Sequence, residues 1–206
     1  INYKISVSSE GFSPVDANDK IPAPPQITGM DTGTFFMENQ KYFEMKIKFK
    51  DNPSEKNYYQ LQLYTKNYFQ NYDSIGNPVM DTNSYFQPMS FESHDLVFDH
   101  EKNFGNSGAM FSDALFNAKG EYQLSIFTYT FSNEYDTSGT SYGFDELLIS
   151  LKSVSEPYYK YVLSYQLYQQ SNGNPFSEPV QVYNNINNGY GIFAGYSATQ
   201  FSIKLN

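Results

Sequence analysis

A ten-residue alternation of apolar and charged side chains restricts the fold of this chain more than any other sequence feature. Between Lys41 and Lys50, apolar residues take every second position and charged residues lie between them: Phe43, Met45, Ile47 and Phe49 against Glu44, Lys46, Lys48 and Lys50. Successive side chains of a strand point to opposite faces of the sheet. The segment is therefore predicted to be a strand with one face in a core. Its charged face is most simply a solvated sheet surface.

Other segments repeat the two-residue period. The clearest contain Tyr59, Leu61 and Leu63, then Tyr122, Leu124 and Ile126, and then Leu147, Ile149 and Leu151. Phe127, Tyr129 and Phe131 change parity after Ile126, which predicts a bulge or a strand buried on both faces. Several strands without a strand–helix–strand rhythm favour antiparallel pairing. We therefore predict a mainly β fold, an antiparallel β-sandwich of the Ig-like or Greek-key type, with one principal α-helix near residues 156–170.

The first 25 residues differ from the rest of the chain. Tyr3, Ile5 and Val7 alternate with polar residues, as in a strand. Four prolines lie between Gly11 and Pro25, and proline stiffens a segment into an extended connector. We predict that residues 1–25 form the terminal strand of an N-terminal β-domain plus a Pro-rich connector. Residues 26–206 then form the main β-sandwich domain.

A helix start is predicted at Ser155, with Ser155 as the N-cap, Glu156 in the first turn and Pro157 where no amide donor is needed. Residues 158–170 contain neither glycine nor proline. Tyrosines and aliphatic residues would cover most of the helix circumference: Tyr158, Tyr159, Tyr161, Val162, Leu163, Tyr165, Leu167 and Tyr168. A helix with so wide an apolar surface is expected to be buried. We predict that β-layers clamp it, with tyrosine hydroxyls reaching partners at its margins.

Composition excludes several function classes. The 206 residues are 18% aromatic and carry a formal net charge of −9. Nucleic acids require clustered cationic side chains, so we expect no nucleic-acid partner. The same charge disfavours direct adsorption to anionic lipid headgroups. The chain has no cysteine, which excludes disulfides, thiolate metal ligands and cysteine nucleophiles.

Both histidines lie among acidic residues, in His94-Asp95 and in Asp99-His100-Glu101. Imidazole and carboxylate groups could bind zinc or a similar metal. However, the separation of six residues matches no common motif, and a solvated loop or strand edge is the favoured interpretation. The sequence also contains neither a Gly-x-Ser-x-Gly nor a His-Glu-x-x-His motif. We therefore predict a protein that is not an enzyme, with no catalytic residue, no metal and no cofactor.

Two segments, residues 67–88 and 133–143, are predicted to be loops that carry aromatic rings beside Asn, Ser, Asp and Gly. On a rigid sandwich, such rings can stack on sugars or peptides while amides donate hydrogen bonds. The candidate ligand-binding residues are Tyr68, Phe69, Tyr72, Tyr135 and Tyr142. In the alternative interpretation, most of these rings fold back onto the sandwich.

Three C-terminal motifs and one central motif resemble a known family. They are SVSEPYYKY at 153–161, NPFSEPVQVYNNI at 174–186, GYGIFAGYS at 189–197, and FSDALF at 111–116 followed by GEYQL at 120–124. The family is the domain of unknown function 4249, outer-membrane lipoproteins of Bacteroidota. The resemblance covers most of the chain. It implies a lipid-anchored cysteine and a small β-domain ahead of a chain that opens here in the middle of a domain.

The resemblance also implies a function and a cellular location. Members of this family are commonly encoded beside TonB-dependent transporters. We therefore expect a non-catalytic cell-envelope lipoprotein that is accessory to such a transporter in nutrient binding or uptake. Its expected location is the outer membrane, at the cell surface or the periplasmic face, held by a lipid anchor that is absent from this chain. The alternative is a stand-alone surface adhesin that binds a glycan or a peptide.

Overall fold

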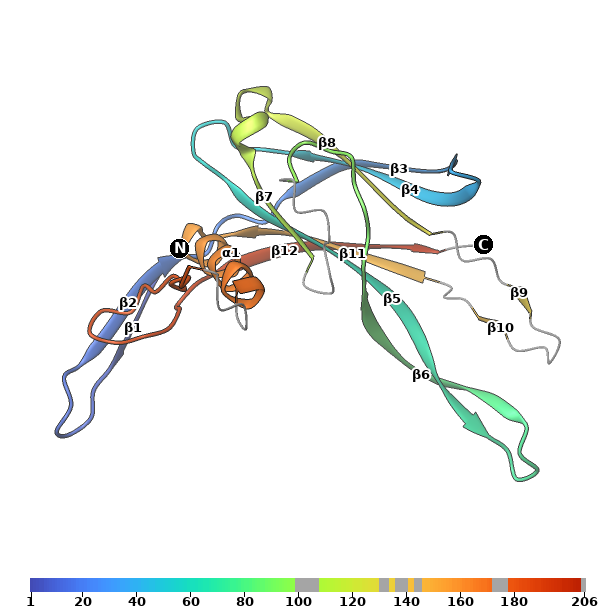
Figure 1. The fold of residues 1–206 in the computed structure, drawn as a ribbon, viewed down its shortest axis with the longest axis horizontal. Helices are drawn as coiled ribbons and strands as arrows, with labels where there is room; N and C mark the ends of the chain where they lie inside the picture. Colours follow the sequence, from blue (N-terminus) through green and yellow to red (C-terminus); the bar gives the residue numbers. More distant parts are fainter. Residues whose placement is uncertain (99–107, 130–133, 136–140, 143–145, 172–177, 205–206) are drawn as a thin grey trace.

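The computed structural model describes residues 1–98, 108–129, 134–135, 141–142, 146–171 and 178–204 (Figure 1). Its helices are α1 (Glu156–Ser171) and the two 3₁₀ turns η1 (Asp113–Leu115) and η2 (Asn117–Lys119). Its strands are β1 (Asn2–Val7), β2 (Val15–Lys20), β3 (Gln26–Met37), β4 (Gln40–Lys50), β5 (Tyr58–Tyr72), β6 (Pro78–Met89), β7 (Ala109–Ser112), β8 (Glu121–Tyr129), β9 (Glu134–Tyr135), β10 (Ser141–Tyr142), β11 (Glu146–Val154) and β12 (Tyr196–Lys204).

Two antiparallel sheets form the body of the protein, which confirms the predicted mainly β sandwich. The larger sheet has the order β12-β11-β5, and β5 then pairs with two strands in succession along one edge. β7 pairs with residues 58–61 of β5, and β6 pairs with residues 63–72. The smaller sheet has the order β3-β4-β8.

The core lies between the two sheets. The predicted alternation in β4 is confirmed, because Met45, Ile47 and Phe49 are fully buried while Glu44, Lys46 and Lys48 face away from the core. The inward residues of β5, β8 and β11 meet them: Tyr59, Leu61, Leu63, Leu124, Ile126, Leu147, Ile149 and Leu151. Burial of these side chains supplies the main driving force for folding.

The predicted helix is confirmed as α1, but the prediction that β-layers clamp it is wrong. None of its 16 residues is buried. Its first half packs Tyr158, Tyr159, Val162 and Leu163 on the outer face of the larger sheet, against Tyr58, Met110 and Val154. In its second half Tyr165, Leu167 and Tyr168 are 40–47% exposed. Tyrosine tolerates this position because its hydroxyl remains in water while its ring stacks on a neighbour, as Tyr165 does on Tyr161 at 5.8 Å.

Val15–Lys20, inside the predicted connector, is a strand that pairs antiparallel with β1. The segment before β12 is hydrogen-bonded to the β1–β2 hairpin. Asn187 N donates to Asp16 O at 2.8 Å, and Gly195 N donates to the Asp19 carboxylate at 2.9 Å. Gly195 O also accepts the amide of Ser155, the residue before α1, so the hairpin, helix and last strand are joined there. The division into domains at residue 25 stays a prediction.

The prediction of a loop over residues 67–88 is wrong. β11 pairs with β5 only as far as Thr65, and beyond that point β5 continues with β6 as a two-stranded hairpin. We call residues 66–86 the β5–β6 arm. The arm extends past the remaining strands of its sheet (Figure 1). Within the second predicted loop, β9 and β10 form a short antiparallel pair, and residues 133, 136–140 and 143 lie outside the described part.

Acid is expected to destabilise the protein partly through Glu146. The hydroxyl of Ser202 and the ammonium of Lys66, whose Nζ donates at 3.1 Å, lower the pKa of this carboxyl. A folded-state pKa below the unfolded value means that stability is lost as pH falls through these values. We expect a Glu146→Gln variant to lose less stability than the wild type between about pH 5 and pH 3. Urea unfolding across this range measures the difference.

The matched control is Glu10→Gln, which removes a carboxylate from an exposed turn. Its stability should fall with pH in parallel with the wild type. Equal pH dependence of all three proteins would contradict the role given to Glu146.

Candidate functional site

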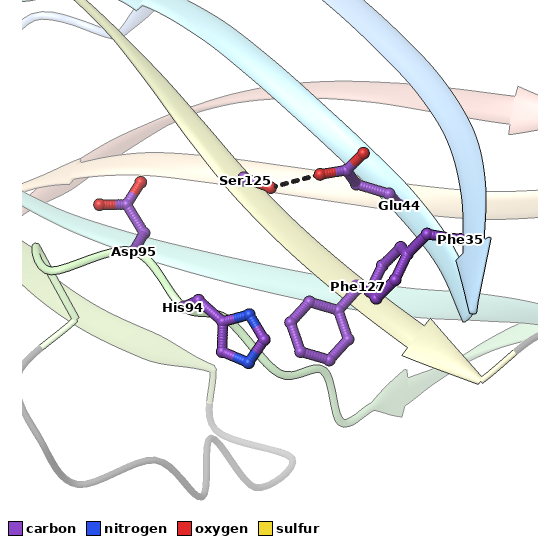
Figure 2. A pocket seen from close by; sticks show the side chains of 6 residues that line it. All are labelled: Phe35, Glu44, His94, Asp95, Ser125 and Phe127. Atoms are coloured by element: carbon purple, nitrogen blue, oxygen red, sulfur yellow. Dashed lines mark hydrogen bonds between the residues drawn. The ribbon is translucent and has the colours of Figure 1, made fainter. Parts of the chain in front are cut away.

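The outer face of the smaller sheet carries a pocket with a volume of about 410 Å³. Its lining comes from three strands and from the segment that follows β6, and Figure 2 shows the six side chains. They are Phe35 of β3, Glu44 of β4, Ser125 and Phe127 of β8, and His94 and Asp95 of the segment 90–98. Small-molecule sites in proteins have volumes of about 300–1,000 Å³, so the size suits a small ligand or one group of a larger one.

The segment 90–98 is bound to the free edge of β8. Glu92 and Phe127 exchange backbone hydrogen bonds of 2.9 and 2.8 Å, as neighbours in an antiparallel sheet do. Ser93 Oγ donates to Ser125 O at 2.6 Å and accepts the amide of Asp95 at 3.0 Å. These bonds bring His94 and Asp95 beside residues of β8 that lie about 30 positions later in the chain.

One wall of the pocket is aromatic. The ring of Phe127 meets Phe35 edge-on at 5.4 Å and lies 4.9 Å from the imidazole of His94. Behind them Tyr42 contacts both phenylalanines at 5.4 Å and is only 7% exposed, although it lies on the outer face. Burial raises the pKa of Tyr42, and the nearby Tyr129 adds to the shift. The rings form a fixed apolar surface because each is held by at least one other ring.

The other wall consists of two carboxylates and a hydroxyl. Glu44 accepts a hydrogen bond of 2.9 Å from Ser125 Oγ, and its second oxygen lies 3.1 Å from Lys46 Nζ. Asp95 accepts hydrogen bonds from the Tyr122 hydroxyl at 2.7 Å and from the Val97 amide at 3.2 Å. Burial and the Asp95 carboxylate raise the pKa of Tyr122, which keeps that hydroxyl a donor. Both carboxylates are therefore held in position before any ligand arrives.

The structure does not bring the predicted ligand-binding residues together at this pocket. Tyr68 and Tyr72 lie on the β5–β6 arm of the other sheet. Tyr72 is 67% exposed, whereas Tyr68 is partly buried with Lys66 Nζ 5.7 Å above its ring. The side chains of Phe69, Tyr135 and Tyr142 lie outside the described part of the structure.

Only part of the predicted histidine and acid cluster, residues 94–101, lies within the described part of the structure. His94 and Asp95 line the pocket, and Asp99, His100 and Glu101 lie outside the described residues. Among the residues that the structure describes, no group of three histidines, cysteines or acids is placed to hold a metal ion. The His94 ring lies against Phe127, with 4.9 Å between the ring centroids and 50° between the ring planes.

Sequence reasoning missed four of the six lining residues: Phe35, Glu44, Ser125 and Phe127. Glu44 was assigned to a solvated face. The available signal was the change of parity after Ile126, and the structure confirms a strand buried on both faces there, with Ile126 at 0% and Phe127 at 3% exposure. An apolar residue on the outer face of an otherwise amphipathic sheet indicates that something covers or uses that face.

Fold and pocket together define an antiparallel β-sandwich with a small-ligand pocket on the outer face of one sheet. A family model, described as a domain of unknown function (DUF4249), matches residues 1–202 of the 206. The chain belongs to this family. Neither the curated proteins nor the solved structures include a significant match. Among the helices that the structure describes, none is long and apolar enough to span a membrane.

Proposed function

We propose that this protein is a non-catalytic binding protein of the cell envelope, accessory to a TonB-dependent outer-membrane transporter in nutrient binding or uptake. The observation that carries the binding role is the pocket of Figure 2, which aromatic rings and fixed hydrogen-bond acceptors line together. Ligand sites commonly combine apolar side chains with a few well-placed polar groups in this way.

The polar side chains of the pocket already have hydrogen-bond or ion-pair partners within the protein, which favours binding over catalysis. A general base or nucleophile needs a reactive atom directed at the substrate. Here Glu44 is already paired with Lys46 and bonded to Ser125, and Asp95 already accepts two hydrogen bonds. Groups held in this way orient a ligand and do not need to change protonation during binding.

The transporter part of the proposal rests on the family resemblance and on one surface. The β5–β6 arm ends in a turn in which the Asp73 carboxylate accepts the amides of Ile75 and Asn77 at 2.9 and 2.8 Å. Beside this ordered turn, Tyr72, Ile75 and Val79 are 67%, 81% and 47% exposed. Apolar side chains grouped on a projecting element are typical of contact sites for another protein. We assign the arm to the transporter contact and the membrane location to an N-terminal lipid anchor.

Co-purification tests the transporter assignment. We expect the full-length lipoprotein, extracted from its native membrane in mild detergent, to bring a TonB-dependent transporter with it. Ile75→Ser should reduce the recovered transporter about tenfold, because one central apolar contact is worth roughly 1–2 kcal/mol. The matched control is Leu115→Ser, which removes an exposed leucine from η1 on the body of the protein.

The alternative function is a stand-alone adhesin for a glycan or a peptide. The observation that favours it is also on the arm, where Tyr85 and Phe86 are 42% and 45% exposed in addition to Tyr72. An adhesin should bind a glycan or peptide array through these rings and purify from the membrane without a transporter. That result would replace the transporter assignment.

A further inference from the structure

We propose that the outer-face pocket recognises an organic cation, a ligand in which an ammonium group adjoins an apolar portion. The inference deepens the proposed binding function and rests on it. It follows from three properties of the pocket: its hydrogen-bond acceptors, its charge, and its aromatic rings (Figure 2).

The polar wall offers acceptors. Glu44 and Asp95 are carboxylates, which accept hydrogen bonds when ionised. The hydroxyl hydrogen of Ser125 is directed to Glu44, so Ser125 Oγ has acceptor capacity left for a ligand. A ligand that satisfies this wall must therefore bring donors, and an ammonium group brings up to three without a competing acceptor.

The charge of the pocket is negative. Lys46 compensates Glu44, with 3.1 Å between Nζ and the carboxylate. Among the described residues, Asp95 accepts hydrogen bonds from uncharged donors, the hydroxyl of Tyr122 and the amide of Val97. Within the described part of the chain, no lysine forms an ion pair with Asp95. A partly buried carboxylate without a counter-charge favours a cationic ligand over a neutral or anionic one.

A third carboxylate, that of Glu92, adds to the negative charge near the pocket. Glu92 is the residue that exchanges backbone hydrogen bonds with Phe127, and its side chain is exposed. Its charge contributes to the raised pKa of Tyr42, the tyrosine that supports the aromatic wall. Glu92 therefore places negative potential beside the rings, which attracts cations and repels anions.

The aromatic wall suits the remainder of such a ligand. Phe127, Phe35 and His94 form a continuous ring surface, with centroid separations of 5.4 and 4.9 Å from Phe127. Phenylalanine faces attract a cation within about 6 Å through the ring quadrupole and also cover alkyl or aryl groups. An ammonium held by one of these carboxylates would leave the attached carbon chain along the rings.

The test compares a cation with its neutral counterpart. Isothermal titration or ligand-observed NMR at pH 7 measures binding of n-butylamine, n-butanol and glucose to the wild-type chain. We expect n-butylamine to bind about tenfold more tightly than either neutral probe, and the difference to shrink as salt increases.

Two variants locate the effect. Asp95→Asn keeps an oxygen that accepts from Tyr122 and Val97 but removes the charge, and it should weaken n-butylamine binding about tenfold. Glu10→Gln removes one charge from the distant β1–β2 turn and should leave binding unchanged. Circular dichroism checks that each variant folds, and the comparison of amine with alcohol on the wild type needs no variant.

The outcomes separate this inference from the proposed function. Binding of n-butanol or glucose at the same affinity as n-butylamine, or tighter, would overturn the cation assignment while the pocket remains a binding site. Amine binding that Asp95→Asn leaves unchanged would also overturn it. Failure of all three probes to bind at millimolar concentration would overturn both the cation assignment and the binding role of the pocket.

Discussion

Replacing Phe49 with alanine is expected to lower the free energy of unfolding by about 3–5 kcal/mol. Phe49 is fully buried in the sandwich core. Its ring contacts Tyr59 of β5 at 5.1 Å and Phe116 at 5.8 Å, with Phe111 and Tyr122 within 6.4 Å. Alanine would leave a cavity bounded by four other rings, which cannot all move inward to fill it.

Urea denaturation followed by far-UV circular dichroism measures this loss. The matched control is Phe36→Ala, since Phe36 is 72% exposed on β3 and its removal should change stability by less than about 0.5 kcal/mol. A loss below about 1 kcal/mol at Phe49 would contradict the burial of this ring in the core.

Gly108→Ala is expected to cost about 2–5 kcal/mol for a different reason. Gly108 precedes β7 with a φ of 80°, and a Cβ there would meet the carbonyl oxygen of Leu61 and the side chain of Gln62. The substitution adds a strained backbone angle to a collision with the backbone of β5, which is central to its sheet. Thermal or urea unfolding measures the loss.

A second glycine separates the two costs. Gly11 has a φ of 81°, nearly the same, but a Cβ at that position meets no atom within 4 Å. Gly11→Ala should therefore cost only the left-handed backbone term, about 1–2 kcal/mol. Equal losses at the two positions would show that β5 does not approach Gly108 closely.

The regular parts of the sandwich follow from local patterns. The alternation in residues 41–50 predicts β4 and its buried face, and Ser155-Glu156-Pro157 predicts the start of α1. The hydroxyl of Ser155 accepts the amide of Tyr158 at 3.5 Å, and Glu156 pairs with Lys160 at 3.0 Å. These features are predictable because each depends on residues close together in the sequence.

The environment of α1 was not predictable from its own residues. A tyrosine-rich surface is compatible with a core or with a boundary where rings stack and hydroxyls meet water. The choice depends on what the rest of the chain brings to the helix. In this fold one sheet face covers Tyr158, Tyr159, Val162 and Leu163, and the second half continues past that contact.

The pocket was beyond sequence reasoning for a similar reason. Its residues come from positions 35, 44, 94–95, 125 and 127, and hydrogen bonds such as those between Glu92 and Phe127 bring positions 94–95 beside 125 and 127. In the alternating pattern of β4, Glu44 occupies a position that normally faces solvent. It lines a pocket here because Phe35 and Phe127 lie beside it. The β5–β6 arm is not recognisable from its sequence because asparagine and proline are common in loops, whereas here Pro78 is paired with Tyr72 in the edge strand β6.

The outer face of the smaller sheet is the proposed site of a small ligand. The most direct measurement is a ¹⁵N–¹H NMR titration of the labelled wild-type chain with n-butylamine. We predict shift changes concentrated at Phe35, Glu44, His94, Asp95, Ser125 and Phe127. Changes concentrated at residues 72–79 of the β5–β6 arm, or no change at any residue, would contradict the claim.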